Sequence, residues 1–230
     1  MFKTKCSSVL VPIVFFIFFD CIALSLNFWL SYSLSENAVA INLSGRQRML
    51  SQRMTKALFY LNSNSDFSSD STQLAFLEFK NAVLLFDQTL NSLWQGGETL
   101  GGDQKPIKIK AVVDENARIN IAQGLQLWSQ VYLQLQPLVD SASITPLLYQ
   151  AAKANLEQNN IMLLKLMNEL TLSLELNSVK EAQNLRLLQS LVLVLALINF
   201  LLICKRLLSG IKFSQRNIHS LNPYLKVLCY

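Results

Sequence analysis

Glycine, proline and charge are scarce in this sequence of 230 residues. It contains 7 glycines and 5 prolines, and only 15% of its residues are charged whereas 51% are hydrophobic. The shortage of glycine and proline argues against a fold with many tight turns and favours long helices. Soluble domains carry about 25% charged residues, so the low charge content favours a membrane protein.

Cysteine is absent from residues 31–186, because the four cysteines are Cys6, Cys21, Cys204 and Cys229. No disulfide can therefore hold this central region together, and it must be stable through side-chain packing alone. The sequence also has a single histidine and shows no metal-ligand cluster, nucleophile–base pair or glycine-rich nucleotide loop. We therefore expect neither an enzyme nor a cofactor.

Two apolar segments, residues 9–30 and 187–204, are long enough to span a bilayer. A cleaved signal peptide is the alternative for the first segment, but its apolar run is too long and no small-residue cleavage site follows it. Asp20 would be costly inside this span. We expect it to be protonated or bonded at a helix–helix contact, facing Asn199 of the second span.

The positive charge lies at the two ends of the chain. Residues 31–186 carry 13 Lys/Arg and 14 Asp/Glu, whereas the flanks beyond the two spans carry seven Lys/Arg and no acid. This distribution indicates membrane topology and not a nucleic-acid partner. We expect a two-pass protein of the bacterial inner membrane, with cytoplasmic segments 1–8 and 205–230 and a periplasmic domain at 31–186.

Hydrophobic periodicity predicts four helices in the central region. We expect them at residues 32–61, 71–94 and 111–139, and from Pro146 onward into the second span without a break. Asn62 to Asp66 read as a polar loop, Asp70 with Gln73 as a cap, and Gly96-Gly97 as a helix end followed by a loop through Pro106. The expected fold is all-α, an antiparallel four-helix bundle flanked by two transmembrane helices.

The residues expected to face the bundle core recur at steps of three and four. In the first helix they are Leu43, Leu50, Met54, Ala57 and Leu61; in the second, Phe76, Phe79, Val83, Phe86, Leu90 and Leu93; in the third, Ala117, Ile121, Gly124, Trp128, Val131, Leu135 and Leu138; in the fourth, Leu156, Leu163, Met167, Leu170 and Leu174.

Residues 42–54, NLSGRQRMLSQRM, place three arginines within eight residues of the first helix. Helical spacing puts Asn42, Arg46, Met49 and Arg53 on one face, and Ser44, Arg48, Ser51 and Gln52 on another. A guanidinium group offers a planar fork of donors that suits an oxyanion. Gly45 costs about 1 kcal/mol in mid-helix and suggests a close approach by a helix or a ligand. The alternative is that the arginines are solvated or pair with Glu78, Asp87, Glu157 or Glu169.

The stretch INLSGRQRMLSQRM resembles the signature of the periplasmic sensor domain shared by type IV pilus methyl-accepting chemotaxis transducers and nitrate/nitrite sensor kinases. Residues 160–168, NIMLLKLMN, resemble a second part of that domain. The resemblance implies a dimeric four-helix sensor. In the nitrate-sensing branch one arginine from each subunit binds an anion at the dimer interface, and that position is Arg48 here. Gly45, Met49, Ser51 and Arg53 also match.

Arg46-Gln47 and Gln52 are similar to the pilus branch, so nitrate or nitrite is a candidate ligand only. The candidate ligand-binding residues are Arg48, Gly45, Ser51, Arg46, Arg53 and Asn42, with Arg46 and Arg53 as rivals of Arg48.

The sequence therefore predicts a receptor module whose domain at residues 31–186 senses a small anion and transmits a helix displacement across the membrane. We expect a homodimer and a separate cytoplasmic signalling partner. Only 24 residues follow Arg206, too few for an output domain. The alternatives are a truncated receptor remnant and an interaction protein that binds another membrane receptor.

Overall fold

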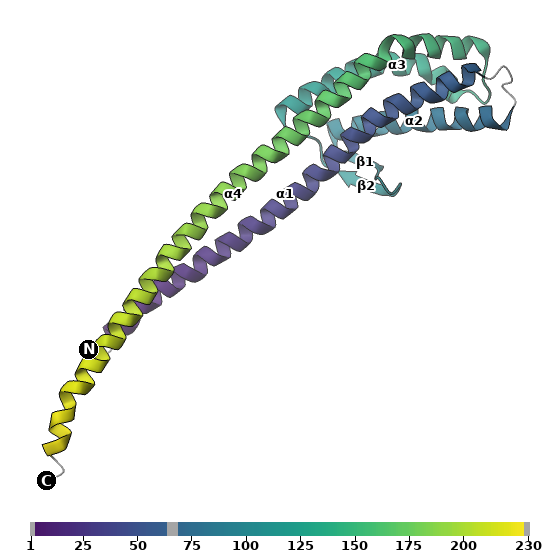
Figure 1. The fold of residues 1–230 in the computed structure, drawn as a ribbon. Coiled ribbons are helices and arrows are strands. Elements are labelled where there is room, and N and C mark those ends of the chain that lie inside the picture. The colour runs from purple at the N-terminus through teal and green to yellow at the C-terminus, as the bar shows by residue number, and fades with distance from the viewer. Residues whose placement is uncertain (1–2, 64–68, 228–230) are drawn as a thin grey trace. The chain divides into compact units, whose positions relative to one another are not determined.

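A computed structural model describes residues 3–63 and 69–227, and the side chains of residues 10–61 and 69–212. Its elements are α1 (Lys3–Ser63), α2 (Asp70–Gln95), β1 (Gly97–Leu100), β2 (Pro106–Ile109), α3 (Glu115–Asp140) and α4 (Pro146–Val227) (Figure 1). The chain divides into two compact units, Leu34–Lys180 and Met1–Ser33 with Glu181–Tyr230. Parts of the predicted loop at 62–66 and of the predicted tails at 1–8 and 205–230 fall outside the described residues.

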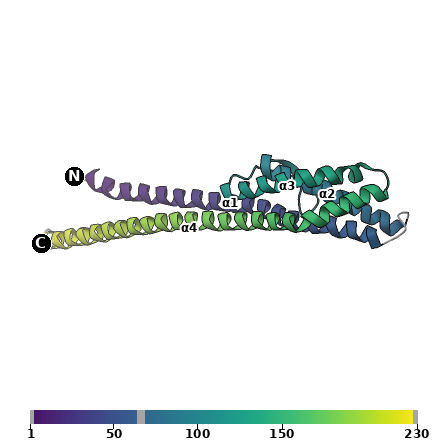
Figure 2. The ribbon, with the colours of Figure 1, turned by 90° about the horizontal axis from the view of Figure 1, so that it is seen from above.

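The unit Leu34–Lys180 is an antiparallel four-helix bundle, which confirms the predicted fold class. Within it, Figures 1 and 2 show α2 and α3 running alongside the parts of α1 and α4 that belong to this unit. Every residue that the periodicity assigned to the core of the four helices is buried, with at most 8% of its surface exposed among the apolar members. The apolar stripes alone therefore predicted which face of each helix turns inward.

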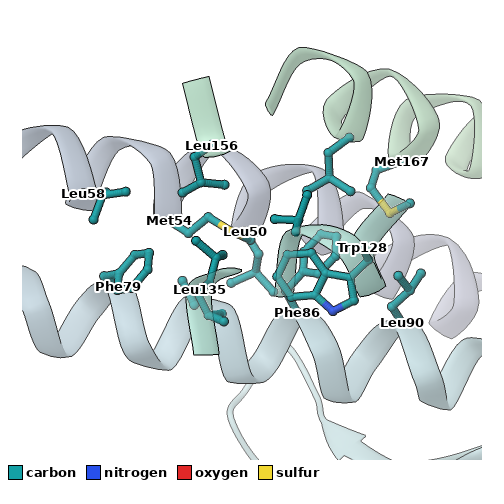
Figure 3. Close-up of a cluster of buried hydrophobic side chains, with 14 of the residues drawn as sticks. Leu50, Met54, Leu58, Phe79, Phe86, Leu90, Trp128, Leu135, Leu156 and Met167 are labelled. Carbon is teal, nitrogen blue, oxygen red and sulfur yellow. The ribbon is translucent and has the colours of Figure 1, made fainter. Parts of the chain in front are cut away.

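The centre of the core is built from large side chains of all four helices (Figure 3). The rings of Phe86 and Trp128 lie 4.3 Å apart, centroid to centroid, at an interplanar angle of 49°. Trp128 is 2% exposed, and its indole Nε1 donates to Asp87 Oδ1 at 2.9 Å. This bond lets a large aromatic residue enter the core without leaving its polar N–H group unsatisfied.

The helix ends follow local sequence, with one correction. Ser69, not Asp70, caps α2, because its hydroxyl accepts from the backbone N–H of Thr72 and its backbone is extended. Asp70 is instead the first helical residue, and its carboxylate interacts favourably with the positive end of the helix dipole. Gly96 ends α2 as predicted, and its φ is 77°. A side chain there would also place its Cβ 3.1 Å from the Ala111 backbone nitrogen.

The segment predicted as a loop between the second and third helices contains an antiparallel hairpin. β1 and β2 pair in a register that sets Glu98 opposite Lys108 and Thr99 opposite Ile107. The connection between α2 and α3 is longer than expected: α3 begins at Glu115, capped by Asp114, and not near residue 111. Strands of four residues are too short to show a clear alternation of apolar and polar positions.

The other unit pairs the apolar ends of α1 and α4. Each of these helices has an 18-residue stretch apolar enough to cross a membrane, with mean hydropathy 2.2 in α1 and 2.6 in α4. Asn199 Nδ2 donates to the Pro12 carbonyl oxygen at 2.8 Å, and the Phe16 and Phe200 rings lie 6.0 Å apart. The expected contact between Asn199 and Asp20 was wrong, since Asp20 is exposed on α1.

Candidate functional site

Residues 42–54 form a continuous part of α1 within the bundle, with their polar side chains divided between the core and the surface. Ser44, Gln47 and Ser51 are buried, whereas Asn42, Arg48, Gln52 and Arg53 are exposed. The Gln47 amide reaches across the core and donates to the Phe86 carbonyl oxygen at 2.8 Å. This bond joins α1 to α2 at the level of the arginines.

Arg48 is exposed and contacts α4. Its Nη1 donates to Asn168 Oδ1 at 2.9 Å, and it forms no ion pair with any carboxylate among the residues that the structure describes. Asn168 ends the second stretch that carried the resemblance. The structure thus brings the two stretches together at one point of the surface, where a cationic group remains open to a further partner.

Arg46 lies on a different side of α1 and holds the hairpin. Its Nη1 donates to the Gly101 carbonyl oxygen at 3.0 Å, and its Nη2 donates to Thr89 Oγ1 at 3.0 Å and Thr99 Oγ1 at 3.4 Å. Its buried Nε has no acceptor in the described part of the chain. Desolvation by burial lowers the pKa of the Arg46 guanidinium group from its ordinary value. The side chain is therefore a charged group held only by neutral partners.

Arg53 is paired with an acid, which was the alternative that the sequence left open. Its Nε lies 2.6 Å from Glu78 Oε1 on α2, and both side chains are about half exposed. The other three acids proposed as partners go elsewhere. Asp87 accepts from Trp128, and Glu157 and Glu169 each lie near a lysine one helical turn before them.

Three further candidate residues surround the arginines. Asn42 is exposed one turn before Arg46. Ser51 is 1% exposed, and its hydroxyl donates to the Arg48 carbonyl oxygen at 2.8 Å, so it lies beneath Arg48 and not beside an open surface. Apart from its chain neighbours and the backbone of its own helix, no described atom lies within 4 Å of the place that a Cβ of Gly45 would occupy. Within one chain, the close approach expected at Gly45 is absent from the described residues.

Two of the three arginines line a cavity. It has a volume of about 520 Å³ and lies between α1, α2 and the turn after β1; Arg46, Met49 and Arg53 line it, and Arg48 does not. This confirms that the first three share one face of the helix. The predicted second face divides, since Ser44 and Ser51 turn into the core while Arg48 and Gln52 stay exposed.

Sequence reasoning missed the partners that position Arg46. Thr89 and Thr99 are both buried, and their hydroxyls lie 2.8 Å apart. Thr89 comes from α2 and Thr99 from β1, so only the folded hairpin brings them to Arg46. The one available signal was Thr89 itself, a polar residue beside Leu90 on the apolar stripe of α2.

Comparison with known proteins agrees with the motif. Residues 29–143, half of the chain, match the family described as the N-terminal domain of type IV pili methyl-accepting chemotaxis transducers (PilJ). No curated protein and no solved structure matches the chain. The matched range contains residues 42–54 together with all of α2, the hairpin and α3, and the family is one of sensory, non-catalytic domains. The chain therefore belongs to the family of type IV pili methyl-accepting chemotaxis transducer N-terminal domains.

Proposed function

We propose that this protein is a transmembrane receptor module of the bacterial inner membrane that senses a small anion. The bundle would lie in the periplasm, and both termini would lie in the cytoplasm. Family membership supports the sensory role, and the basic flanks of two apolar helices support the orientation. Residues 31–186 would form the sensor domain, with spans at 9–30 and 187–204.

The continuity of α1 and α4 supports transmission across the membrane. Each is one unbroken helix, of 61 and 82 residues, that contributes to the bundle and also contains an apolar stretch of membrane-spanning length. A helix is stiff along its axis because each turn is bonded to the next. A small displacement of α1 against α4 in the bundle would therefore be carried into the spans and read by a separate cytoplasmic partner.

The open side of Arg48 supports an anion site at a homodimer interface. An exposed guanidinium group that is bonded only to a neutral amide keeps most of its donors available. Two such groups facing each other across a twofold axis would repel, and a planar oxyanion between them would remove that repulsion. Gly45 lies one turn away, and no described atom beyond its chain neighbours and its own helix backbone lies within 4 Å of the place of its Cβ, which leaves room for a second α1. Nitrate and nitrite are the anions to test first.

The test is calorimetric titration of the full chain in lipid nanodiscs with nitrate and with nitrite. We expect binding in the micromolar to millimolar range, with one anion for each two chains. Arg48→Ala should abolish it. Arg48→Lys keeps the charge but loses the planar fork, so it should weaken binding by at least about tenfold. Lys56→Ala is the matched control, because it removes an exposed cation from the same helix.

Equal heats in Arg48→Ala and the parent would remove Arg48 from the site. An equal loss in Lys56→Ala would show that the general charge of the helix, and not a bound anion, was being measured. Crosslinking in native membranes that recovered only heterologous partners would refute the homodimer.

A further inference from the structure

The cavity beside Arg46 has the size of a small-molecule site. Its volume of about 520 Å³ falls within the range of about 300–1,000 Å³ that such sites occupy. Three parts of the fold line it: α1, α2 and the hairpin, whose turn contributes Gly101, Gly102 and Gln104. All of these residues belong to one chain and one unit, so the cavity does not depend on a dimer.

The charge of the cavity favours an anion. Two of its residues are cationic, Arg46 and Arg53, and one is anionic, Glu78. Arg53 contacts the Glu78 carboxylate through its Nε. Among the described residues, its two terminal nitrogens have no partner. Arg53 therefore offers donors at the mouth of the cavity in addition to its existing ion pair.

Arg46 adds a charge that the fold does not compensate. Its bonds go to one backbone carbonyl and two hydroxyls, and its buried Nε lacks an acceptor in the described chain. A desolvated charge without a counter-ion is costly, and an anion nearby would stabilise it. Arg46 and Arg53 lie two helical turns apart on the same face of α1, so both guanidinium groups would attract an anionic group that lies between them.

The remaining lining is mixed: Asn81, Gln88 and Gln104 contribute amide groups, and the rest of the side chains are apolar. Met49 lies between the two arginines on α1, and Leu85 of α2 and Leu100 of β1 contribute aliphatic surface. In small-molecule sites the apolar walls bury the body of the ligand and a few polar or charged groups fix its orientation. A simple inorganic anion would leave these walls without a partner.

We propose that this cavity binds a small organic carboxylate, with its carboxylate between Arg46 and Arg53 and its aliphatic body against Met49, Leu85 and Leu100. This site is separate from the proposed anion site at Arg48, which lies on the side of α1 that contacts α4. A ligand here would also tie the hairpin turn to α1, because the turn forms one wall of the cavity.

The test is calorimetric titration of the full chain in nanodiscs with pentanoate, a carboxylate with a short aliphatic tail. Pentanamide has the same shape without the charge, and acetate has the charge without the tail. We expect pentanoate to bind at least about tenfold more tightly than either compound, since each lacks one of the two complementary features. Lys56→Ala should bind pentanoate as the parent does, because Lys56 is exposed and does not line the cavity.

Two variants test the place of binding. Arg53→Ala removes the free donors, and Asn81→Trp fills the cavity from an exposed position of α2 without touching the core. Each should weaken pentanoate binding by at least about tenfold, while circular dichroism shows that the helices remain. Three results would overturn the proposal: no pentanoate binding by the parent at about 10 mM, binding by both variants as tight as that of the parent, or loss of pentanoate binding in Arg48→Ala.

Discussion

Replacing Gly45 by alanine should stabilise the bundle. Glycine in a helix interior is less favourable than alanine by about 0.8–1.0 kcal/mol, because its backbone loses more freedom on folding. The new methyl group meets no other part of the protein, since apart from its chain neighbours and the backbone of its own helix no described atom lies within 4 Å of its position. The full gain should therefore appear, and for a domain of 150–250 residues it corresponds to a rise in Tm of roughly 2–4 °C.

Gly124→Ala is the internal comparison. Gly124 also lies in mid-helix, but it is buried, and its Cβ would fall 2.7 Å from Met167 Cε on α4. The same gain in helix propensity is then opposed by overpacking, which costs about 1–3 kcal/mol in a well-packed core. Because the end of a methionine side chain can move, we expect the lower part of that range. Gly124→Ala should melt below Gly45→Ala by several degrees.

The assay is thermal unfolding of the full chain in detergent, followed by far-ultraviolet circular dichroism at several protein concentrations. A lower Tm for Gly45→Ala than for the parent would refute the reasoning, because it would require a contact at Gly45. If that loss grew with protein concentration, the contact would be with a second copy. A weaker nitrate response in Gly45→Ala despite a higher Tm would support the proposed dimer.

Two further predictions concern other groups of the bundle. Arg46→Met should lower stability by about 1–3 kcal/mol, because it removes the charged donor from the Gly101 carbonyl and from the hydroxyls of Thr89 and Thr99; faster hydrogen exchange of the hairpin amides, with the helices unchanged, would check it, and unaltered hairpin exchange would contradict it. Burial, and to a smaller extent Glu157, raises the pKa of Tyr149 above its ordinary value. The neutral phenol therefore stabilises the folded state fully below the pKa of tyrosine in the unfolded chain, about 10, and this stabilisation is lost as the pH rises from there through the folded pKa. The Tm of the parent should therefore fall above about pH 10, the fall should be smaller in Tyr149→Phe, and an identical fall in both would exclude this phenol as the cause.

The helices could be predicted because their signal is repeated. In α2 the stripe from Phe76 to Leu93 gives six concordant positions, and each one is buried in the structure. A one-residue error in the phase would have turned several large apolar side chains into water, so the pattern admits one orientation only. The hairpin lacked this redundancy, since each strand has four residues and one face of it is largely exposed.

The site was only partly predictable for a related reason. Arg46, Arg48 and Arg53 differ little in local sequence, yet they contact a hairpin turn, an amide on α4 and a carboxylate on α2. Each helical residue advances the direction of its side chain by about 100°, so Arg48 faces another element than Arg46 does. Arg46 and Arg53 share a face but lie two turns apart along α1, so they meet different partners. Which element lies there depends on the register of the helices, and the motif contains no information about that register.

The sequence by itself determined the four amphipathic helices, the two membrane-length apolar stretches and the family, because periodicity, hydropathy and a contiguous motif are local properties of the chain. Only the tertiary structure decided which arginine is held by neutral groups, which is paired and which remains open. Those outcomes depend on residues far apart in the chain, from Thr99 of the hairpin to Asn168 of α4, that meet only when the helices pack.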